Sequence, residues 1–473
     1  MSPSVSEDIA SNGPTATPSS TSGKPHVLIV GGGLGGLMLA LLLERANIPY
    51  QVFERASKAR ALGSAMSLGA NILPVFEQLG ILEDVKNISL PVYEQRLYEA
   101  SMKRSGALTM KDYKDITGYD TYVFPRPELH QLMLERVPVE KVLVNKKVLS
   151  MEQNQLGVMI RCADGTQYHG DILVGADGAY SSVRQALYKK LDAKGSLPKS
   201  DTESLALGFI TMVGVTHALD PEKYPCLKET VVNFSQVIGG HYMSWHTLTV
   251  PGNRVCWNAS IQLTSEAESR ACQFRNSEWG PESIENTIKV FKECKVPIGG
   301  TMGDLIEATP QDLISRVYLE EKLFETWQHG RTALIGDGAV NAMQDAVILA
   351  NVINDLESTN PADIKVALES YQEQRYPHAK FEYMNSKMIS KIMTGQKWNE
   401  RLLRHIAFNL PGWVRMRGFI KSAVYRPQAS FLPFIEKRGT GSVLPQAPSH
   451  RQSAKPRRSM TEKRGKRATV VSI

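Results

Sequence analysis

The glycines and the acidic residue of segment 26–54 have the types and the spacing of a phosphate-binding turn. A predicted strand runs into Gly31-x-Gly33-x-x-Gly36, an apolar helix follows, and a second predicted strand ends at Glu54. Gly31 permits a sharp turn, Gly33 leaves room for a pyrophosphate, and Gly36 lets the helix pack closely on the sheet. The N–H groups at the start of that helix can bind phosphates, and Glu54 is placed to accept from ribose hydroxyls. The segment therefore predicts a dinucleotide-binding unit.

A second motif, Gly-Ala-Asp-Gly around Asp177, follows a predicted strand and precedes a helix that carries Arg184. Asp and Gly favour turns, and Ser181 is a good helix N-cap, so a capped turn with a purely structural role is one interpretation. A contact with the cofactor is the other.

Four segments together resemble the flavin-dependent aromatic hydroxylases (group A flavoprotein monooxygenases). Asp177 matches the D-G motif, which in that family helps hold FAD and the incoming nicotinamide cofactor. Ser67 lies in a stretch similar to the flavin-side loop, Arg126 matches an FAD-contacting arginine before a helix, and Asp337 matches the G-D motif that contacts the ribityl or ribose part of FAD. The chain looks most like fungal members, including epoxidases of meroterpenoid and indole-diterpene pathways.

This resemblance implies an α/β fold with a Rossmann-like FAD-binding domain of the p-hydroxybenzoate hydroxylase (PHBH) type, interrupted by a β-rich substrate domain and followed by a helical C-terminal region. It implies FAD as cofactor, NADH or NADPH as co-substrate, and O2, which together hydroxylate or epoxidise a hydrophobic or aromatic small molecule through a flavin C4a-hydroperoxide. The implied cofactor contacts are Gly31, Gly33, Gly36, Glu54, Ser67, Arg126, Asp177, Asp337 and Ala339.

Candidate substrate contacts are weaker. Tyr242, Trp245 and Trp257 lie in the β-rich part, where they could line a substrate pocket, and Tyr242 is the one catalytic candidate. Aromatic residues in strands more often belong to the core, so burial in the core is the favoured interpretation of each.

The chain departs from the family after Asp337. In the family a His-Lys-x-x-Pro segment separates the G-D motif from the next helix and places N–H dipoles along the flavin pyrimidine edge. Here Gly338 and Ala339 follow directly. A true deletion and a gene-model splice error are both consistent with this join. The alternative function is therefore a flavin-binding protein with impaired or no turnover, and a weaker third hypothesis is a flavin reductase of isoprenoid lipids.

The order of predicted elements indicates a discontinuous cofactor domain. A β-rich region is inserted into it, and helices are expected at 282–293, 311–327, 339–356 and 363–393. The expected parts are a disordered tail (1–24), the FAD-binding domain (25–188 and 330–395), the substrate domain (189–329), an apolar and basic segment (396–436) and a disordered basic tail (437–473).

Charge and composition limit the ligands, metal sites and cellular locations that the chain is expected to have. From residue 437 to the end there are ten Lys/Arg and one acid, which is +9, so the net charge of +7 leaves about −2 elsewhere and no nucleic-acid footprint is expected. The five scattered cysteines and ten histidines show no metal-ligand spacing, so no metal is expected. No signal peptide or membrane-spanning run is visible, which favours a cytoplasmic protein. A peripheral membrane contact through 401–473 is an alternative to a solvated tail and a packed helix.

Overall fold

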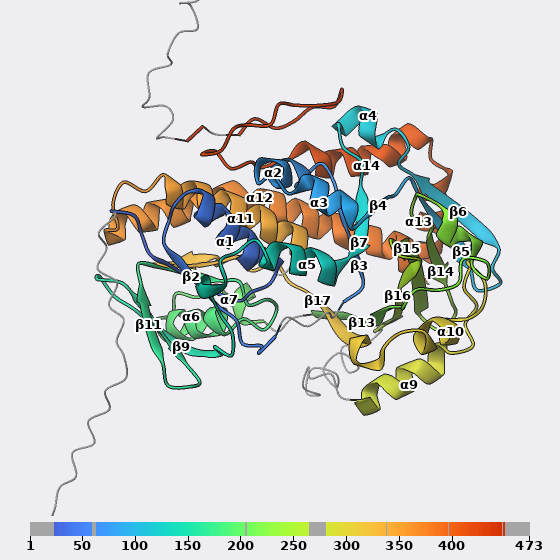
Figure 1. Cartoon of the computed structure of the whole chain (residues 1–473), viewed down its shortest axis with the longest axis horizontal. Coiled ribbons are helices and arrows are strands. Elements are labelled where there is room, and N and C mark those ends of the chain that lie inside the picture. The colour runs from blue at the N-terminus through green and yellow to red at the C-terminus, as the bar shows by residue number, and fades with distance from the viewer. Residues whose placement is uncertain are drawn as a thin grey trace, which may run out of the picture.

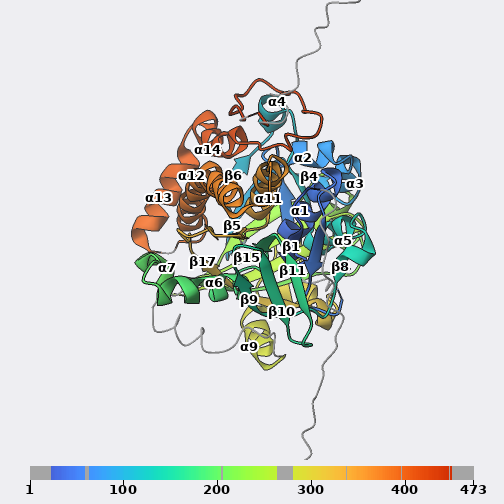
Figure 2. The same cartoon turned by 90° about the vertical axis from the view of Figure 1, so that its left-hand side faces the viewer.

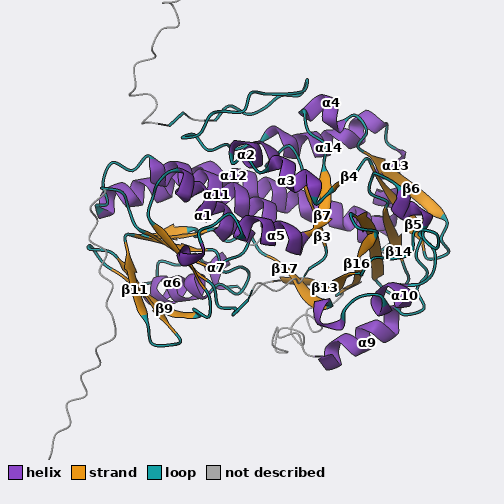
Figure 3. Cartoon of the chain, viewed as in Figure 1, coloured by secondary structure: helices purple, strands orange, loops and turns teal. Residues whose placement is uncertain are grey.

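The computed structural model describes residues 23–58, 63–203, 206–263, 281–336, 338–395, 397–446 and 448–449. Asp337 and the two ends of the chain therefore lie outside the described residues. The described chain has the mixed α/β fold that the sequence predicts: a mostly parallel sheet with helices, joined to a β-rich lobe and to a C-terminal helical region (Figure 1, Figure 3).

The central sheet has six strands in the order β18-β19-β12-β1-β2-β8, and its neighbours are parallel except for β18. Strand β1 reads Val-Leu-Ile-Val and is wholly buried, as expected for a parallel strand covered on both faces. The strands are β1 (Val27–Val30), β2 (Tyr50–Phe53), β8 (Val142–Leu143), β12 (Ile172–Gly175), β18 (Gln328–His329) and β19 (Thr332–Leu334).

Two layers cover this sheet (Figure 1, Figure 2). One face packs against α1, α5, α11 and α12, and the other packs against α6 and a three-stranded sheet. The helices are α1 (Leu34–Arg45), α5 (Arg126–Leu134), α6 (Ser182–Ala193), α11 (Ala339–Asn354) and α12 (Pro361–Thr394). The three-stranded sheet contains β9 (Val148–Gln153), β10 (Val158–Cys162) and β11 (Gln167–Gly170).

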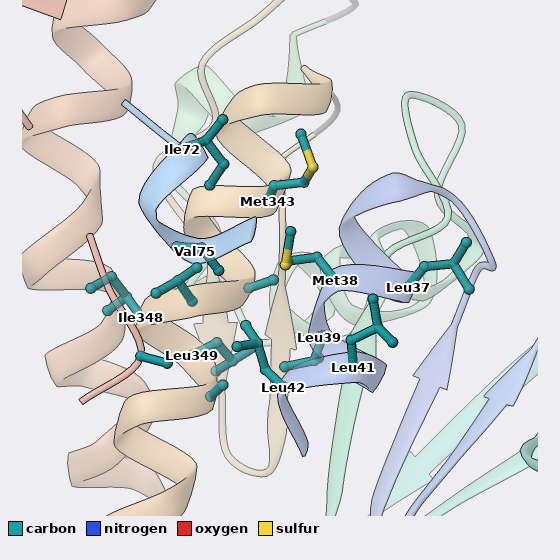
Figure 4. Close-up of a cluster of buried hydrophobic side chains, with 14 of the residues drawn as sticks. Leu37, Met38, Leu39, Leu41, Leu42, Ile72, Val75, Met343, Ile348 and Leu349 are labelled. Atoms are coloured by element: carbon teal, nitrogen blue, oxygen red, sulfur yellow. The ribbon is translucent and has the colours of Figure 1, made fainter. Parts of the chain in front are cut away.

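The contact between α1 and α11 forms the centre of the larger core (Figure 4). Leu39 and Leu42 of α1 face Leu349 of α11 in this cluster, and all three are fully buried. The helices approach closely at Gly35, where an added Cβ would lie 2.8 Å from the Cβ of Ala342. The turn that carries the first glycine motif is therefore fixed against the helix that follows β19.

The second lobe contains a seven-stranded sheet in the order β17-β13-β16-β15-β14-β5-β6, and a small sheet, β3-β7-β4, lies between the lobes. The large sheet consists of β5 (Glu94–Glu99), β6 (Arg104–Thr109), β13 (Ala206–Val215), β14 (Phe234–Ile238), β15 (Met243–Val250), β16 (Arg254–Gln262) and β17 (Ser315–Glu321). The small sheet consists of β3 (Ala65–Leu68), β4 (Leu90–Pro91) and β7 (Tyr122–Pro125).

Further helices complete the described chain. They are α2 (Leu73–Gln78), α3 (Leu82–Asn87), α4 (Tyr113–Thr117), α7 (Lys199–Thr202), α9 (Pro281–Phe291), α10 (Met302–Glu307), α13 (Trp398–Asn409) and α14 (Gly412–Val424). Single 3-10 turns occur at Val139–Lys141, Pro225–Lys228 and Gln311–Leu313.

The structure differs from the sequence prediction in two elements. The helix expected at 311–327 is wrong: after one 3-10 turn the chain forms β17, whose alternating Val317 and Leu319 pair with β13. Strands β5 and β6 lie within the segment assigned to the FAD-binding domain, yet they complete the large sheet, because β5 pairs in parallel with β14. Residues distant in sequence thus decide both differences.

Part of the segment expected to be a disordered basic tail is packed on the folded chain. Arg438 pairs with Glu77, and the N–H groups of Thr440 and Gly441 donate to carbonyl oxygens of the α4 segment at 3.0 and 2.7 Å. The Ser449 hydroxyl donates a hydrogen bond to the Asp355 carboxylate. These contacts place 438–446 and 448–449 in the fold, whereas residues 447 and 450–473 lie outside the described part.

Candidate functional site

A cavity of about 400 Å³ lies at the carboxyl ends of β1, β2, β12 and β19. This edge of a doubly wound sheet is where such folds bind ligands. The structure brings to its wall the predicted residues Gly31, Gly33, Glu54, Arg126, Asp177 and Ala339. They come from five separate segments, so the wall is a product of the tertiary fold.

The three motif glycines have three different surroundings. Gly31 has a φ of 109°, and an added Cβ there would lie 2.4 Å from the carbonyl oxygen of Ala176. An added Cβ at Gly36 would lie 2.1 Å from the carbonyl oxygen of Gly31. At Gly33 nothing in the described chain lies within 4 Å of that position, and Gly33 is the N-cap of α1. Gly31 and Gly36 therefore serve close packing, whereas Gly33 leaves open space in front of the helix N-terminus.

Glu54 holds the glycine turn as well as lining the cavity. Its two carboxylate oxygens accept hydrogen bonds from the N–H groups of Gly32 and Ala56, both at 2.8 Å. His130 of α5 contacts the carbonyl oxygen of Gly32 through Nε2 at 2.7 Å, and burial lowers the pKa of this imidazole. The sequence analysis missed His130, because nothing in its local pattern shows that α5 lies beside the glycine turn.

Four cationic side chains line the cavity, namely Arg55, Arg126, Lys146 and Lys147. Only Arg126 was predicted from the sequence. The two lysines follow β8, and β8 is the neighbour of β2 in the sheet. Their position directly after a strand could have marked the two lysines as candidate ligand contacts. The sequence near them does not show, however, that β8 lies beside β2. The excess of positive charge suits a phosphate-bearing ligand.

Asp177 caps α6. Its Oδ1 accepts from the Ser181 hydroxyl at 2.5 Å, and its Oδ2 accepts from the N–H of Ser182 at 2.6 Å. Ser181 is itself the N-cap and accepts from the N–H of Arg184 at 2.9 Å. The motif therefore caps α6 and also contributes to the cavity wall, and the contact of Asp177 with a cofactor stays a prediction.

The turn between β19 and α11 is short and is held by a buried ion pair. The Asp345 carboxylate accepts from the N–H of Gly336 at 2.8 Å and pairs with Arg375 of α12 at 2.7 Å. The side chains of Asp345 and Arg375 are almost fully buried. Ala339 is the first residue of α11 and reaches the cavity wall, whereas Asp337 lies outside the described residues.

A second cavity of about 290 Å³ adjoins the first across Gly178 and Gly336. It lies between the N-terminus of α6, the segment before β18 and α12, and its wall includes Arg184, Phe324 and Glu382. The Arg184 guanidinium stacks on the Phe324 ring at 4.4 Å and donates to the carbonyl oxygen of Ala179 at 2.5 Å.

The remaining predicted residues do not line either cavity. Ser67 lies in β3 and is exposed. Tyr242 lies in the turn before β15 with a φ of 60°. Trp245 and Trp257 are core residues of the second lobe, where their indole N–H groups donate to the Lys295 carbonyl and the Thr309 hydroxyl, both at 2.9 Å. The favoured core interpretation is confirmed for the two tryptophans.

The opposite face of the large sheet carries a polar band that the sequence analysis did not identify. His246 of β15 pairs in register with Gln236 of β14 and Asn258 of β16, so the three side chains share a face. Gln236 donates to the carbonyl oxygen of Met393 at 3.1 Å. The buried His246 Nε2 and Gln262 Oε1 have no hydrogen-bond partner among the described residues. Burial lowers the pKa of His246 to about 4, and a hydrogen bond with Asn258 only partly opposes this.

Comparison with known proteins gives the cavity a chemical context. Residues 24–220 match the family model described as an FAD binding domain. The chain therefore carries an FAD-binding domain, and it is similar over most of its length to fungal FAD-dependent monooxygenases. It is 26% identical over 440 residues to the FAD-dependent monooxygenase ausM of Penicillium brasilianum, covering 88% of this chain and 89% of that protein. It is 28% identical over 392 residues to the FAD-dependent monooxygenase ptmM of Penicillium ochrochloron, covering 78% and 89%.

Solved structures show the same fold. HpxO of Klebsiella pneumoniae, in complex with FAD and uric acid, superposes with a TM-score of 0.64 at 20% identity, covering 85% of this chain and 97% of that one. CtdE, in complex with FAD and its substrate, gives a TM-score of 0.62 at 17% identity, covering 85% and 99%. The predicted fold is therefore confirmed, as is the predicted resemblance to FAD-dependent monooxygenases, and the names of these relatives support an enzyme.

The cavity fits the AMP and pyrophosphate part of FAD. The open space at Gly33 in front of α1 can take a pyrophosphate, the neighbouring cationic side chains can balance its charge, and Glu54 lies beside this turn. In the part of the chain that the structure describes, no group of three or more His, Cys, Asp or Glu side chains could hold a metal ion.

Proposed function

We propose that this monooxygenase uses NADH or NADPH and O2 to hydroxylate or epoxidise a hydrophobic small molecule. The observation that carries the proposal is the cavity in which Gly33, Glu54, Arg126 and Ala339 converge from separate segments. When bound there, FAD would supply the redox chemistry, which is oxidation of the nicotinamide nucleotide and activation of oxygen. The names of the fungal relatives support this function over a flavin-binding protein without turnover.

The residues of the chain would act by holding and shielding. The N-terminus of α1 and the cationic wall would bind the pyrophosphate, and Glu54 would fix the glycine turn through the N–H of Gly32. Asp345 would hold the Gly336 turn at the boundary of the two cavities. The fold between the two lobes would exclude water from the reacting groups.

We further propose that the substrate carries a hydrogen-bonding group on an otherwise apolar body. Buried polar atoms in proteins almost always have partners, so His246 Nε2 and Gln262 Oε1, which have none among the described residues, support a polar ligand group at this face. The pKa of about 4 keeps the His246 ring neutral near pH 7, so it can both donate and accept. Ala65 and Ser67 are two positions apart in β3, so their side chains lie on the same face of this strand. Ala65 packs in the hydrophobic cluster that also contains Leu248 of the large sheet.

A spectroscopic experiment tests the function. The purified protein should be yellow or take up added FAD, and NADH or NADPH should bleach it without oxygen, with the colour returning in air. With a panel of apolar compounds that differ in one hydroxyl or carbonyl group, label from ¹⁸O2 should enter a product. A colourless protein that takes up no FAD would overturn the proposal. NAD(P)H oxidation that yields only hydrogen peroxide with every compound would support the alternative of impaired turnover.

A further inference from the structure

Two consecutive helices expose large apolar side chains in stripes. Trp398, Leu402 and Ile406 follow each other at helical spacing on α13, with exposed fractions of 79%, 50% and 49%. The second half of α12, which packs against α13, exposes a similar stripe at i, i+3 and i+7. That stripe consists of Phe381, Met384 and Met388, exposed at 41%, 59% and 55%. Isolated exposed apolar residues are ordinary, but three at helical spacing on each of two helices that pack together indicate an interaction surface.

The opposite side of α13 attaches this helix to the protein. Arg404 donates to the carbonyl oxygen of Gly395 at 2.8 Å, and the Phe408 ring lies against β6, 2.5 Å from where a Cβ at Gly106 would be. Arg404 and Phe408 are four positions apart and so share a face, about 140° around the helix from the stripe of α13. Figure 2 shows α13 outside α12 at the edge of the molecule.

The structure changes which segment can meet a membrane. The segment 401–473, for which membrane contact was an alternative, includes α14, but α14 packs on the body, where Met416 and Ala423 are buried in the main core. None of the described helices is long and apolar enough to cross a bilayer. The surface under consideration therefore lies on the second half of α12 and on α13, and it can only lie along an interface.

The charges around this surface are positive. Between residues 380 and 410 the sequence has six Lys/Arg and two acids, Glu382 and Glu400, which is +4. Lys387, Lys391 and Lys397 are exposed. The end of the chain after residue 449 adds eight Lys/Arg and one acid, which is +7. Apolar side chains beside Lys and Arg are the pattern of helices that bind anionic lipid surfaces.

We infer that this apolar surface (Phe381, Met384, Met388, Trp398, Leu402 and Ile406) binds an anionic membrane surface. The apolar side chains would enter the boundary between headgroups and acyl chains, and the flanking lysines would contact the lipid phosphates and carboxylates. The basic end of the chain would strengthen attraction without supplying apolar anchors. A second copy of this chain is less suited, because two copies would bring a surface of charge +4 against itself.

Co-sedimentation of the full-length holoenzyme with vesicles tests the inference. Wild type is expected to bind phosphatidylcholine vesicles that contain phosphatidylserine, and to bind pure phosphatidylcholine weakly. The triple variant Trp398→Ser, Leu402→Ser, Ile406→Ser should lose roughly tenfold or more in partition coefficient, because each apolar side chain contributes to insertion. The matched control Val139→Ser, Leu149→Ser, Leu156→Ser removes exposed apolar side chains elsewhere and should bind as wild type.

Three results would overturn the inference. The first is equal binding of the α13 variant and wild type to anionic vesicles. The second is loss of all binding on truncation after Ser449 with no effect of the α13 variant, since the basic end alone would then bind. The third is a wild-type dimer in light scattering that the α13 variant converts to monomer, without vesicle binding by either. Retained FAD content and circular dichroism of each variant would show that the fold is intact.

Discussion

The buried pair Asp345–Arg375 should control both stability and the geometry of the Gly336 turn. Asp345→Asn keeps an oxygen that can accept from the N–H of Gly336 but removes the negative charge beside Arg375. The pair is separated by 2.7 Å and both side chains are at most 1% exposed, so the arginine would stay charged and uncompensated in the core. Breaking such a pair from one side costs about 3–5 kcal/mol.

The loss of unfolding free energy depends on the interaction between Asp345 and Arg375, which a double variant measures. Arg375→Gln alone should cost a similar amount, because among the described residues it leaves the buried Asp345 carboxylate with the N–H of Gly336 as its one hydrogen-bond donor. The double variant Asp345→Asn, Arg375→Gln leaves two neutral amides and should cost less than the sum of the single changes by about 2 kcal/mol or more. The exposed pair Lys365–Glu369, at 3.7 Å, is the matched control: Glu369→Gln should change stability by less than about 0.5 kcal/mol.

Urea unfolding followed by tryptophan fluorescence provides the assay. Trp327 is a local reporter, because its ring lies 5.9 Å from Tyr371 and 5.7 Å from Tyr376, the residues around Arg375 on α12. Weaker FAD retention should accompany the loss of stability, because Gly336 lines both cavities. The reasoning would be refuted if the loss of unfolding free energy in the double variant equalled the sum of the losses in the single variants. It would also be refuted if each single variant lost no more than Glu369→Gln.

Three further predictions concern the cofactor turn, the polar band and the C-terminus. Gly33→Ala should weaken FAD binding at unchanged stability, whereas Gly36→Ala should lower the free energy of unfolding. Of the two added Cβ atoms, the one at residue 36 meets backbone atoms of the described chain and the one at residue 33 does not. FAD titration and calorimetry of both variants measure the two effects. Because the pKa of His246 is lowered in the folded state, the unfolded chain binds a proton at this histidine at a higher pH than the folded chain does. The free energy of unfolding should therefore fall by up to about 3 kcal/mol as the pH drops from 6.5 to 4. In acid unfolding curves His246→Gln should make the free energy of unfolding depend less on pH. Truncation after Lys437 should lower the melting temperature, because it removes the Arg438–Glu77 pair and the backbone bonds of Thr440 and Gly441, whereas truncation after Ser449 should leave it unchanged.

The parts of the fold that the sequence predicted are those with local signals. The turn from Gly31 to Glu54 follows from glycine spacing between apolar runs, and α11 and α12 follow from helical periodicity after β19. The pairing of β5 with β14 joins Gln95 to Phe234, and no pattern in either segment specifies that partner. The strand β17 was predicted as a helix because its seven residues of mixed polarity fit the hydrophobic period of a helix as well as that of a strand. Pairing with β13 decides that this segment is a strand.

The site divides in the same way. Gly33, Glu54 and Arg126 could be found because each lies next to a strand end within a recognisable motif. Lys146 and His130 could not, since their roles depend on β8 lying beside β2 and on α5 lying beside the glycine turn. The polar band on the large sheet depends on the register of three strands, which sets His246 opposite Gln236 and Asn258. Such side chains look like ordinary strand residues until the strands are paired.

The short turn after β19 bears on the two hypotheses for the departure at Asp337. If the missing loop left a defect, the turn would lack internal support, yet the Gly336 N–H has a buried acceptor and α11 begins at Ala339 with its first turn against α1. The adenosine end of the cavity does not depend on the loop, because Glu54 and the α1 N-terminus are held by β1, β2 and α5. Any loss would therefore concern the flavin end alone. FAD should then remain bound while its ring is less restrained, and restoring a loop at Gly338 should change coupling of NAD(P)H oxidation to product more than it changes FAD affinity.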